Sequence, residues 1–163
     1  MLYIGADHAG YEMKEKIKRY FEKENIKYSD MGTDCAKSCN YPEIAKTLCN
    51  EIKQGDKGIL ICGTGLGMSM VANRFNYIRA ALCTKKKQAI FAKEHNNANV
   101  LVLQGRDICF SKNKRIIKAF LTTNFSGSER HVQRINQFSE QEPEKLIEEP
   151  ISNDEYVKLE KEK

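Results

Sequence analysis

The chain has 163 residues, of which 40% are hydrophobic and 30% charged, values typical of one globular domain. No apolar run approaches the roughly 20 residues of a membrane span, and no signal pattern follows Met1, so we expect a soluble, cytoplasmic protein without membrane contact. The net charge of +5 would suit nucleic acid, but no aromatic platform or base-reading motif accompanies the basic clusters, so we expect no nucleic-acid partner.

Short apolar runs alternate with segments of helical periodicity through most of the chain. We expect strands at 2–6, 26–30, 58–62, 78–83 and 99–103, each followed by a helix, at about 10–24, 42–54, 67–75, 86–94 and 111–123. This order predicts an α/β fold, a Rossmann-like three-layer sandwich with a five-stranded parallel sheet. Because the crossovers in such folds are right-handed, the loops after the strands gather at the carboxyl edge of the sheet, where ligand sites form.

The composition changes after Gln137. Residues 140–163 are rich in Glu and Lys, contain Pro143 and Pro150, and have only scattered apolar residues. We therefore expect one domain over residues 1–139 and a flexible charged tail over 140–163. A short helix packed on the domain is the alternative for the tail.

The six cysteines include no CxxC pair, so we expect reduced thiols, most of which pack as small hydrophobic side chains. The three histidines, His8, His95 and His131, are dispersed and never share a metal-ligand spacing on one helix. The sequence therefore predicts no metal site.

Three polar segments lie near predicted strand ends. Residues 7–10, Asp-His-Ala-Gly, follow the first strand, and residues 62–67, Cys-Gly-Thr-Gly-Leu-Gly, follow the third. Residues 94–96, Glu-His-Asn, precede the fifth strand, so they reach the carboxyl edge only if their loop folds back.

The glycine-rich segment after the third strand can offer several backbone amides to an anion. Met68 stands where a dinucleotide fingerprint needs its third glycine, and no Lys-Ser or Lys-Thr follows as in a Walker loop, so we expect no nucleotide cofactor. The remaining interpretation is a cradle for a small anion or a developing oxyanion. Cys62 lies at its mouth, near a helix N-terminus that attracts anions; a simple packing role is the alternative for this cysteine.

Six motifs in this order resemble those of the B-type ribose 5-phosphate isomerases and the related galactose 6-phosphate isomerases. They are Asp7-His8-Ala9-Gly10, Asp30-Met31-Gly32-Thr33, Asn40-Tyr41-Pro42, Cys62-Gly63-Thr64-Gly65, Glu94-His95-Asn96 and Arg130-His131-Val132-Gln133-Arg134. The resemblance covers residues 1 to about 139. It implies an aldose–ketose isomerase that acts on a sugar phosphate without metal or cofactor.

The resemblance also implies the roles of individual residues. Cys62 would be the general base, in contrast to a subgroup that carries glutamate at the position of Met68. Asp7, Thr64 and His95 would open the sugar ring. Tyr41 would line the sugar site. Asn96 and the amides of the loop, among them those of Gly63, Gly65, Gly67 and Met68, would hold the enediolate oxygen.

Four side chains would bind the phosphate by the same resemblance: His8, Arg130, Arg134 and the partner's Arg106. The arginines at 130 and 134 are one helical turn apart, so both can face one phosphate. A homodimer, or a dimer of dimers, with shared active sites is therefore expected.

The chain departs from the family pattern at two places. Asn40 stands where the family often has Asp, and Ser128-Glu129 stands where it often has Gly-Gly. The expected reaction is the interconversion of D-ribose 5-phosphate and D-ribulose 5-phosphate. Two alternatives remain open: an isomerase of a hexose 6-phosphate of the allose or galactose type, and a non-catalytic sugar-phosphate-binding protein on the same fold.

Overall fold

The computed structural model describes residues 1–139, in which strands and helices alternate from the first residues onward. The strands are β1 (Leu2–Ala6), β2 (Ser29–Asp30), β3 (Lys57–Cys62), β4 (Ala80–Leu82) and β5 (Val100–Gln104). The helices are α1 (Tyr11–Lys23), α2 (Tyr41–Glu51), α3 (Leu66–Ala72), α4 (Lys86–Glu94), α5 (Phe110–Thr122) and α6 (Glu129–Asn136), followed by a 3-10 turn, η1 (Gln137–Ser139). The predicted tail over 140–163 lies outside the described residues.

All five strands are parallel and follow the order β2-β1-β3-β5-β4 across the sheet. β3 is central, and its register pairs Ile59 with Ile4 of β1 and with Leu101 of β5. The predicted α/β fold with a five-stranded parallel sheet is confirmed. β1, β3 and β5 are neighbours, so the loops that follow these three strands meet at one edge.

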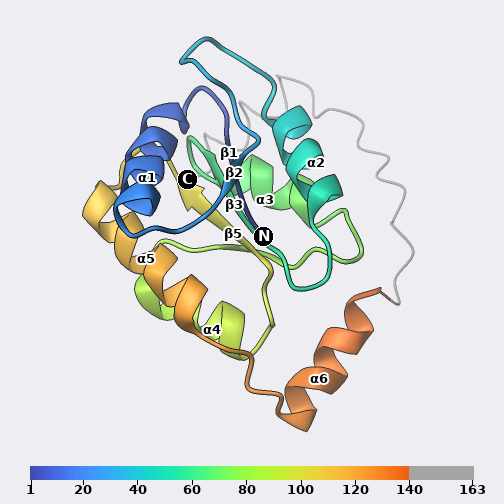
Figure 1. The fold of residues 1–163 in the computed structure, drawn as a ribbon. Helices are drawn as coiled ribbons and strands as arrows, with labels where there is room; N and C mark the ends of the chain where they lie inside the picture. Colours follow the sequence, from blue (N-terminus) through green and yellow to red (C-terminus); the bar gives the residue numbers. More distant parts are fainter. Residues whose placement is uncertain (140–163) are drawn as a thin grey trace, which may run out of the picture.

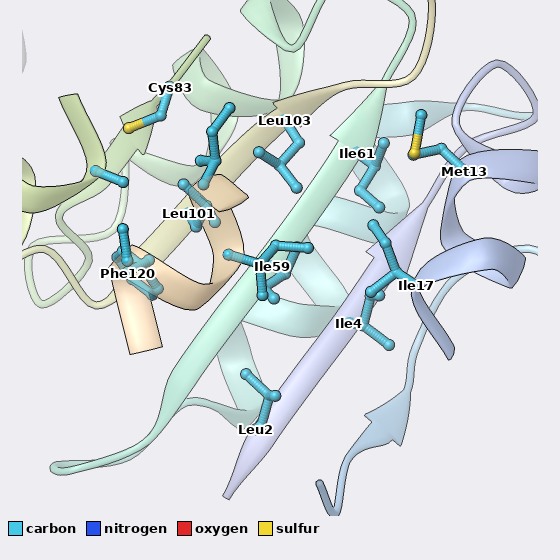
Figure 2. Packing of buried hydrophobic residues seen from close by; sticks show 14 of the residues in the cluster. Leu2, Ile4, Met13, Ile17, Ile59, Ile61, Cys83, Leu101, Leu103 and Phe120 are labelled. Carbon is cyan, nitrogen blue, oxygen red and sulfur yellow. The ribbon is translucent and has the colours of Figure 1, made fainter. Parts of the chain in front are cut away.

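Helices cover both faces of the sheet (Figure 1). One face packs on α1, α4 and α5, and the other packs on α2 and α3. β3 serves both layers because its side chains alternate: Ile59 and Ile61 face the first layer, whereas Leu60 and Cys62 face the second. Figure 2 shows the first layer, where Ile59 and Leu101 lie near Phe120 of α5. Each fully buried side chain of this size contributes roughly 1.5–3 kcal/mol.

Two strands are shorter than predicted, and one helix was not predicted as an element. β2 occupies two of the five positions expected at 26–30, and β4 occupies three of the six expected at 78–83. Both strands lie at the margins of the sheet, where pairing on one side only allows the chain to leave early. α6 was absent from the expected helices because its eight residues are mostly polar and only His131 is buried, although the spacing of Arg130 and Arg134 was interpreted as one helical turn.

No helix of the described residues is long and apolar enough to cross a membrane.

Candidate active site

The loop after β3 begins at Cys62 and fixes the direction of its thiol. Gly65 donates its amide to the Cys62 sulfur over 3.1 Å. Gly65 has a φ of 79°, and a Cβ atom there would lie 2.5 Å from a methyl carbon of Leu82, so the turn depends on glycine. The thiol is therefore held at the end of the strand by the backbone of its own loop.

The same loop leaves a row of backbone donors free. The amide of Leu66 donates to Thr64 Oγ1 over 3.3 Å, and the amide of Ser69 donates to the carbonyl of Gly65 over 3.1 Å. Within residues 1–139, the amides of Gly63, Thr64, Gly67 and Met68 have no hydrogen-bond acceptor. The Met68 side chain is fully buried in the core, so only its amide can serve the loop. Such a row of donors suits an oxygen that develops negative charge.

Asp7 and His8 follow β1, the neighbour of β3, and so reach the same edge. Asp7 Oδ1 accepts the amides of Ala9 at 2.9 Å and Gly10 at 3.0 Å, which closes the turn into α1. His8 Nδ1 accepts the amide of Cys39 over 3.3 Å. Because this nitrogen is an acceptor, a neutral His8 ring carries its proton on Nε2, where it can donate to a ligand.

Two further side chains lie against the glycine-rich loop. Tyr41, at the start of α2, lies so close to Gly67 that a Cβ atom there would be 2.6 Å from its ring. Arg106 follows β5, and its amide donates to the carbonyl of Gly63 over 3.1 Å. Its side chain also lies over Gly63, with Cδ 3.8 Å from the position of a Cβ atom. The resemblance implies that Arg106 comes from the partner, but β5 pairs with β3, so Arg106 lies beside the loop after Cys62 of its own chain.

His95 lies at the other end of the molecule. It caps the C-terminus of α4, which runs back along the sheet, so the loop does not fold back to the carboxyl edge. Its ring stacks on Phe91 with centroids 4.9 Å apart and lies 4.6 Å from the ring of His131. His131 Nδ1 lies 2.8 Å from Ser126 Oγ. Exposed Asn96 follows His95.

Arg130 and Arg134 also belong to this second group. Both are exposed on α6, which stands apart from the body of the domain, beyond the end of α4 (Figure 1). Neither forms an ion pair within the described part of the chain. Burial lowers the pKa of His131, and the nearby His95, Arg130 and Arg134 act in the same direction. This end of the molecule therefore favours an anion.

The structure thus divides the predicted site residues into two sets. One chain brings together Asp7, His8, Tyr41, Cys62, Thr64, Met68, Arg106 and the glycines 63, 65 and 67. It separates them from His95, Asn96, Arg130 and Arg134. The sequence analysis gave no role to Phe91 and His131, whose rings pack against His95, or to Ser126, which lies 2.8 Å from His131 Nδ1. His131 could have been found from the sequence, because it lies within the motif that runs from Arg130 to Arg134.

Two of the other cysteines, Cys49 and Cys83, are buried packing residues. All six thiols are free, as expected. Burial raises the pKa of Cys49 and of Cys83 to about 11, so both are uncharged packing residues at neutral pH. In residues 1–139, no group of three or more His, Cys, Asp or Glu side chains is placed to hold a metal ion.

Comparison with known proteins gives a consistent result. The sequence profile of the family described as Ribose/Galactose Isomerase matches residues 2–138. The crystal structure of ribose 5-phosphate isomerase from Thermotoga maritima has a TM-score of 0.83 and 46% identity, and the match covers 86% of this chain and 97% of that chain. The Mycoplasma genitalium enzyme, ribose-5-phosphate isomerase B with bound ribulose-5-phosphate, has a TM-score of 0.79 and 36% identity, covering 83% of this chain and 91% of that one.

Sequence relatives agree with the solved structures. Ribose-5-phosphate isomerase B of Escherichia coli is 35% identical over 134 residues, which is 81% of this chain and 89% of that protein. A Bacillus subtilis relative that is 40% identical over 146 residues, 88% of this chain and 97% of its own length, carries only a provisional name as a sugar phosphate isomerase. The match over residues 2–138, together with these identities, shows that the chain belongs to the ribose/galactose isomerase family.

Proposed function

We propose that the protein interconverts D-ribose 5-phosphate and D-ribulose 5-phosphate through an enediolate, with Cys62 as the general base. The observation that carries this proposal is the Cys62 thiol, held beside unpaired backbone amides at the end of β3. The names of the relatives, and the ribulose-5-phosphate bound to the Mycoplasma genitalium enzyme, support the choice of substrate.

The chemistry needs one proton to move between adjacent sugar carbons. Cys62 takes the proton from carbon 2 of the aldose and returns it to carbon 1, so a single base on one face suffices. The amides of Gly63, Thr64, Gly67 and Met68 are free to stabilise the oxygen as it becomes negative. No electron leaves the substrate, so the step requires no redox partner.

Ring opening precedes this step and needs an acid and a base near the ring oxygen and the anomeric hydroxyl. Thr64 and Asp7 lie at the Cys62 edge and can serve there. His95, the third predicted group, belongs to the opposite end of the same chain. We therefore infer that His95 and Asn96 of a second subunit complete the site.

Residues from both subunits would also bind the phosphate. His8 and Arg106 come from the chain that supplies Cys62, since both lie at its carboxyl edge. Arg130 and Arg134 would come from the second subunit, whose projecting α6 carries them without ion-pair partners in residues 1–139. A two-fold axis makes both sites equivalent, and each borrows one set of residues. This is compatible with a homodimer or a dimer of dimers.

A hexose 6-phosphate is the second candidate substrate, because the family description names galactose beside ribose. Coupled assays with ribose 5-phosphate, allose 6-phosphate and galactose 6-phosphate separate the two. A ratio of kcat/KM at least tenfold in favour of the pentose supports the proposal, and a preference for a hexose contradicts it. Tight binding of all three sugars without turnover would indicate the non-catalytic alternative.

Mixed dimers test the shared site directly. When Cys62→Ala and Arg134→Ala variants are unfolded and refolded together, one site of a mixed dimer carries both defects and the other carries neither. The assay uses ribose 5-phosphate well below the native KM, where Arg134→Ala alone is nearly inactive because its KM is raised. About half of the dimers are mixed, so activity should return to about a quarter of that of the native protein.

The matched control replaces the second variant with Arg106→Ala. Because Cys62 and Arg106 serve the same site from one chain, each site of this mixed dimer keeps one defect and activity should stay low. Recovery with Arg106→Ala but not with Arg134→Ala would reverse the assignment of the two sets. Failure of both pairs, with mixed dimers present, would mean that no residues are shared.

A further inference from the structure

A separate cavity lies at the amino edge of the sheet, where the strands begin. Its volume is about 570 Å³, within the range of small-molecule sites. It is bounded by the residues that lead into β3, β4 and β5. Four basic side chains line it, Lys53, Lys57, Arg79 and Lys93, together with one carboxylate, Asp56.

The one carboxylate in the lining, that of Asp56, already has partners. Asp56 pairs with the ammonium group of Met1 through Oδ1, and its Oδ2 accepts the amide of Lys53 over 3.1 Å. Within residues 1–139, no carboxylate forms an ion pair with Lys57, Arg79 or Lys93. The cavity therefore carries an uncompensated positive charge.

Arg79 has most of its donors available. Its Nε donates to the carbonyl of Asn97 over 2.8 Å, and its backbone amide donates to Asn99 Oδ1 over 2.7 Å. These contacts fix the guanidinium at the cavity wall and use one of its five N–H groups. The other four have no acceptor in the described part of the chain. Burial lowers the pKa of Arg79, which reflects the cost of holding this charge away from water.

Lys93 brings a second cation to the same wall. It is 8% exposed, and its Nζ donates to the carbonyl of Ala98 over 3.0 Å. Burial lowers the pKa of Lys93, and the charges of Lys57 and Arg79 lower it further, so the three cations lie close enough to repel one another. Buried cations of this kind are normally paired. An anion between them would offset both the burial and the repulsion.

We propose that this cavity binds the phosphate group of a small phosphorylated metabolite, between Lys57, Arg79 and Lys93. A phosphate accepts several charge-assisted hydrogen bonds at once and fills only part of the volume, which leaves room for an organic moiety. Within one chain, the cavity lies at the opposite edge of the sheet from Cys62. The six residues of β3 separate the two ends of the sheet by roughly 16–20 Å, at 3.3 Å per residue.

Calorimetry with inorganic pyrophosphate as the probe tests the proposal on the full chain. The His8→Ala/Arg134→Ala double variant removes two of the groups assigned to phosphate at the Cys62 edge. We expect it to bind pyrophosphate with one site per chain. Adding Lys57→Gln or Lys93→Met should weaken that binding about tenfold or more, whereas Lys118→Gln, an exposed change on α5, should leave it unaltered.

Loss of all binding in the His8→Ala/Arg134→Ala variant would overturn the proposal, as would equal weakening by Lys118→Gln. Insensitivity to both Lys57→Gln and Lys93→Met would do the same. If Lys93→Met does not fold, Lys57→Gln and a crystal of the native chain soaked in pyrophosphate test the site instead. Density between Arg79 and Lys93 supports the proposal, and an empty cavity contradicts it. Isomerase activity does not enter these readouts, so the proposed function can fail independently.

Discussion

The two ends of the sheet hold their polar residues in different ways. At the carboxyl edge, Cys62, Asp7 and His8 each accept a hydrogen bond from a nearby backbone amide. At the other end, Arg130 and Arg134 project from a helix that stands apart, with no ion-pair partner in the described residues. The first set is organised by its own chain, whereas under the proposed function the second set completes the site of a second subunit.

Under the proposed function, this contrast separates two kinds of catalytic contribution. Groups that move a proton need a fixed direction, which a strand end and a tight loop supply. Groups that bind a phosphate need a less exact position, because charges attract over a distance and arginine side chains are long. The comparison therefore predicts losses of turnover at one end and losses of affinity at the other.

The largest effect is expected at Cys62. Cys62→Ala should lower kcat by about 10²- to 10⁴-fold, the usual contribution of a positioned acid–base group, with folding and KM nearly unchanged. Cys49→Ala is the control, because that buried thiol has its pKa raised to about 11 and only packs. Alkylation of the native protein should also abolish turnover, and substrate should protect. Near-normal turnover of Cys62→Ala would show that another base acts.

At the opposite end, Arg134→Ala should act on binding. Loss of a charge-assisted contact of about 1.5–3 kcal/mol should raise KM for ribose 5-phosphate by roughly 10- to 100-fold. The same change should hardly affect turnover of unphosphorylated ribose. Gln133→Ala, on the same helix, serves as the control. Equal losses on both sugars would mean that Arg134 supports the structure of α6 and does not bind phosphate.

Stability of the carboxyl edge should depend on a partly buried ion pair. Lys14, which is 1% exposed, lies 2.5 Å from Asp30 at the end of β2, and Lys18 lies 2.9 Å from the same carboxylate. Lys14→Met should lower the free energy of unfolding by about 1.5–3 kcal/mol, measured with urea near pH 7. Lys18→Met, at a more exposed position, should cost less. If neither variant changes the free energy of unfolding measurably, the ion pair does not stabilise the fold.

The same pair predicts a pH dependence. Burial alone would raise the pKa of Asp30, but hydrogen bonds from Lys14, Lys18 and the amide of Gly32 outweigh it, so the pKa is lowered. The stabilisation is therefore complete above the unfolded value, near pH 4, and is lost as the pH falls through the folded value. The difference in stability between the native protein and Lys14→Met should shrink below about pH 4. A difference that stayed constant down to pH 2 would exclude Asp30 as its source.

The smallest effect is expected for the tail. Because residues 140–163 contain few apolar side chains, a chain truncated after Gln141 should keep its melting temperature and its turnover within error. Thermal unfolding and the coupled assay check both. A clear fall in melting temperature would indicate that Leu146, Ile147 or Ile151 packs on the domain.

The sequence alone determined the alternation of strands and helices and the edge at which Asp7, His8 and Cys62 meet. These features depend on local patterns, namely short apolar runs, helical periodicity and the right hand of the crossovers. Glycine spacing also identified the loop after β3, because the backbone conformation of Gly65 is a local requirement.

Only the tertiary structure decided where the remaining residues lie. Arg106 joins Cys62 because β5 pairs with β3 and not with β2 or β1, a choice made by packing between segments distant in sequence. His95 lies at the opposite end because α4 returns along the sheet before β5 begins. The cationic cavity at the amino edge unites Lys57, Arg79 and Lys93, which no local pattern connects. Such groupings arise when the strands take their order in the sheet, and that order depends on long-range contacts which the linear sequence does not reveal.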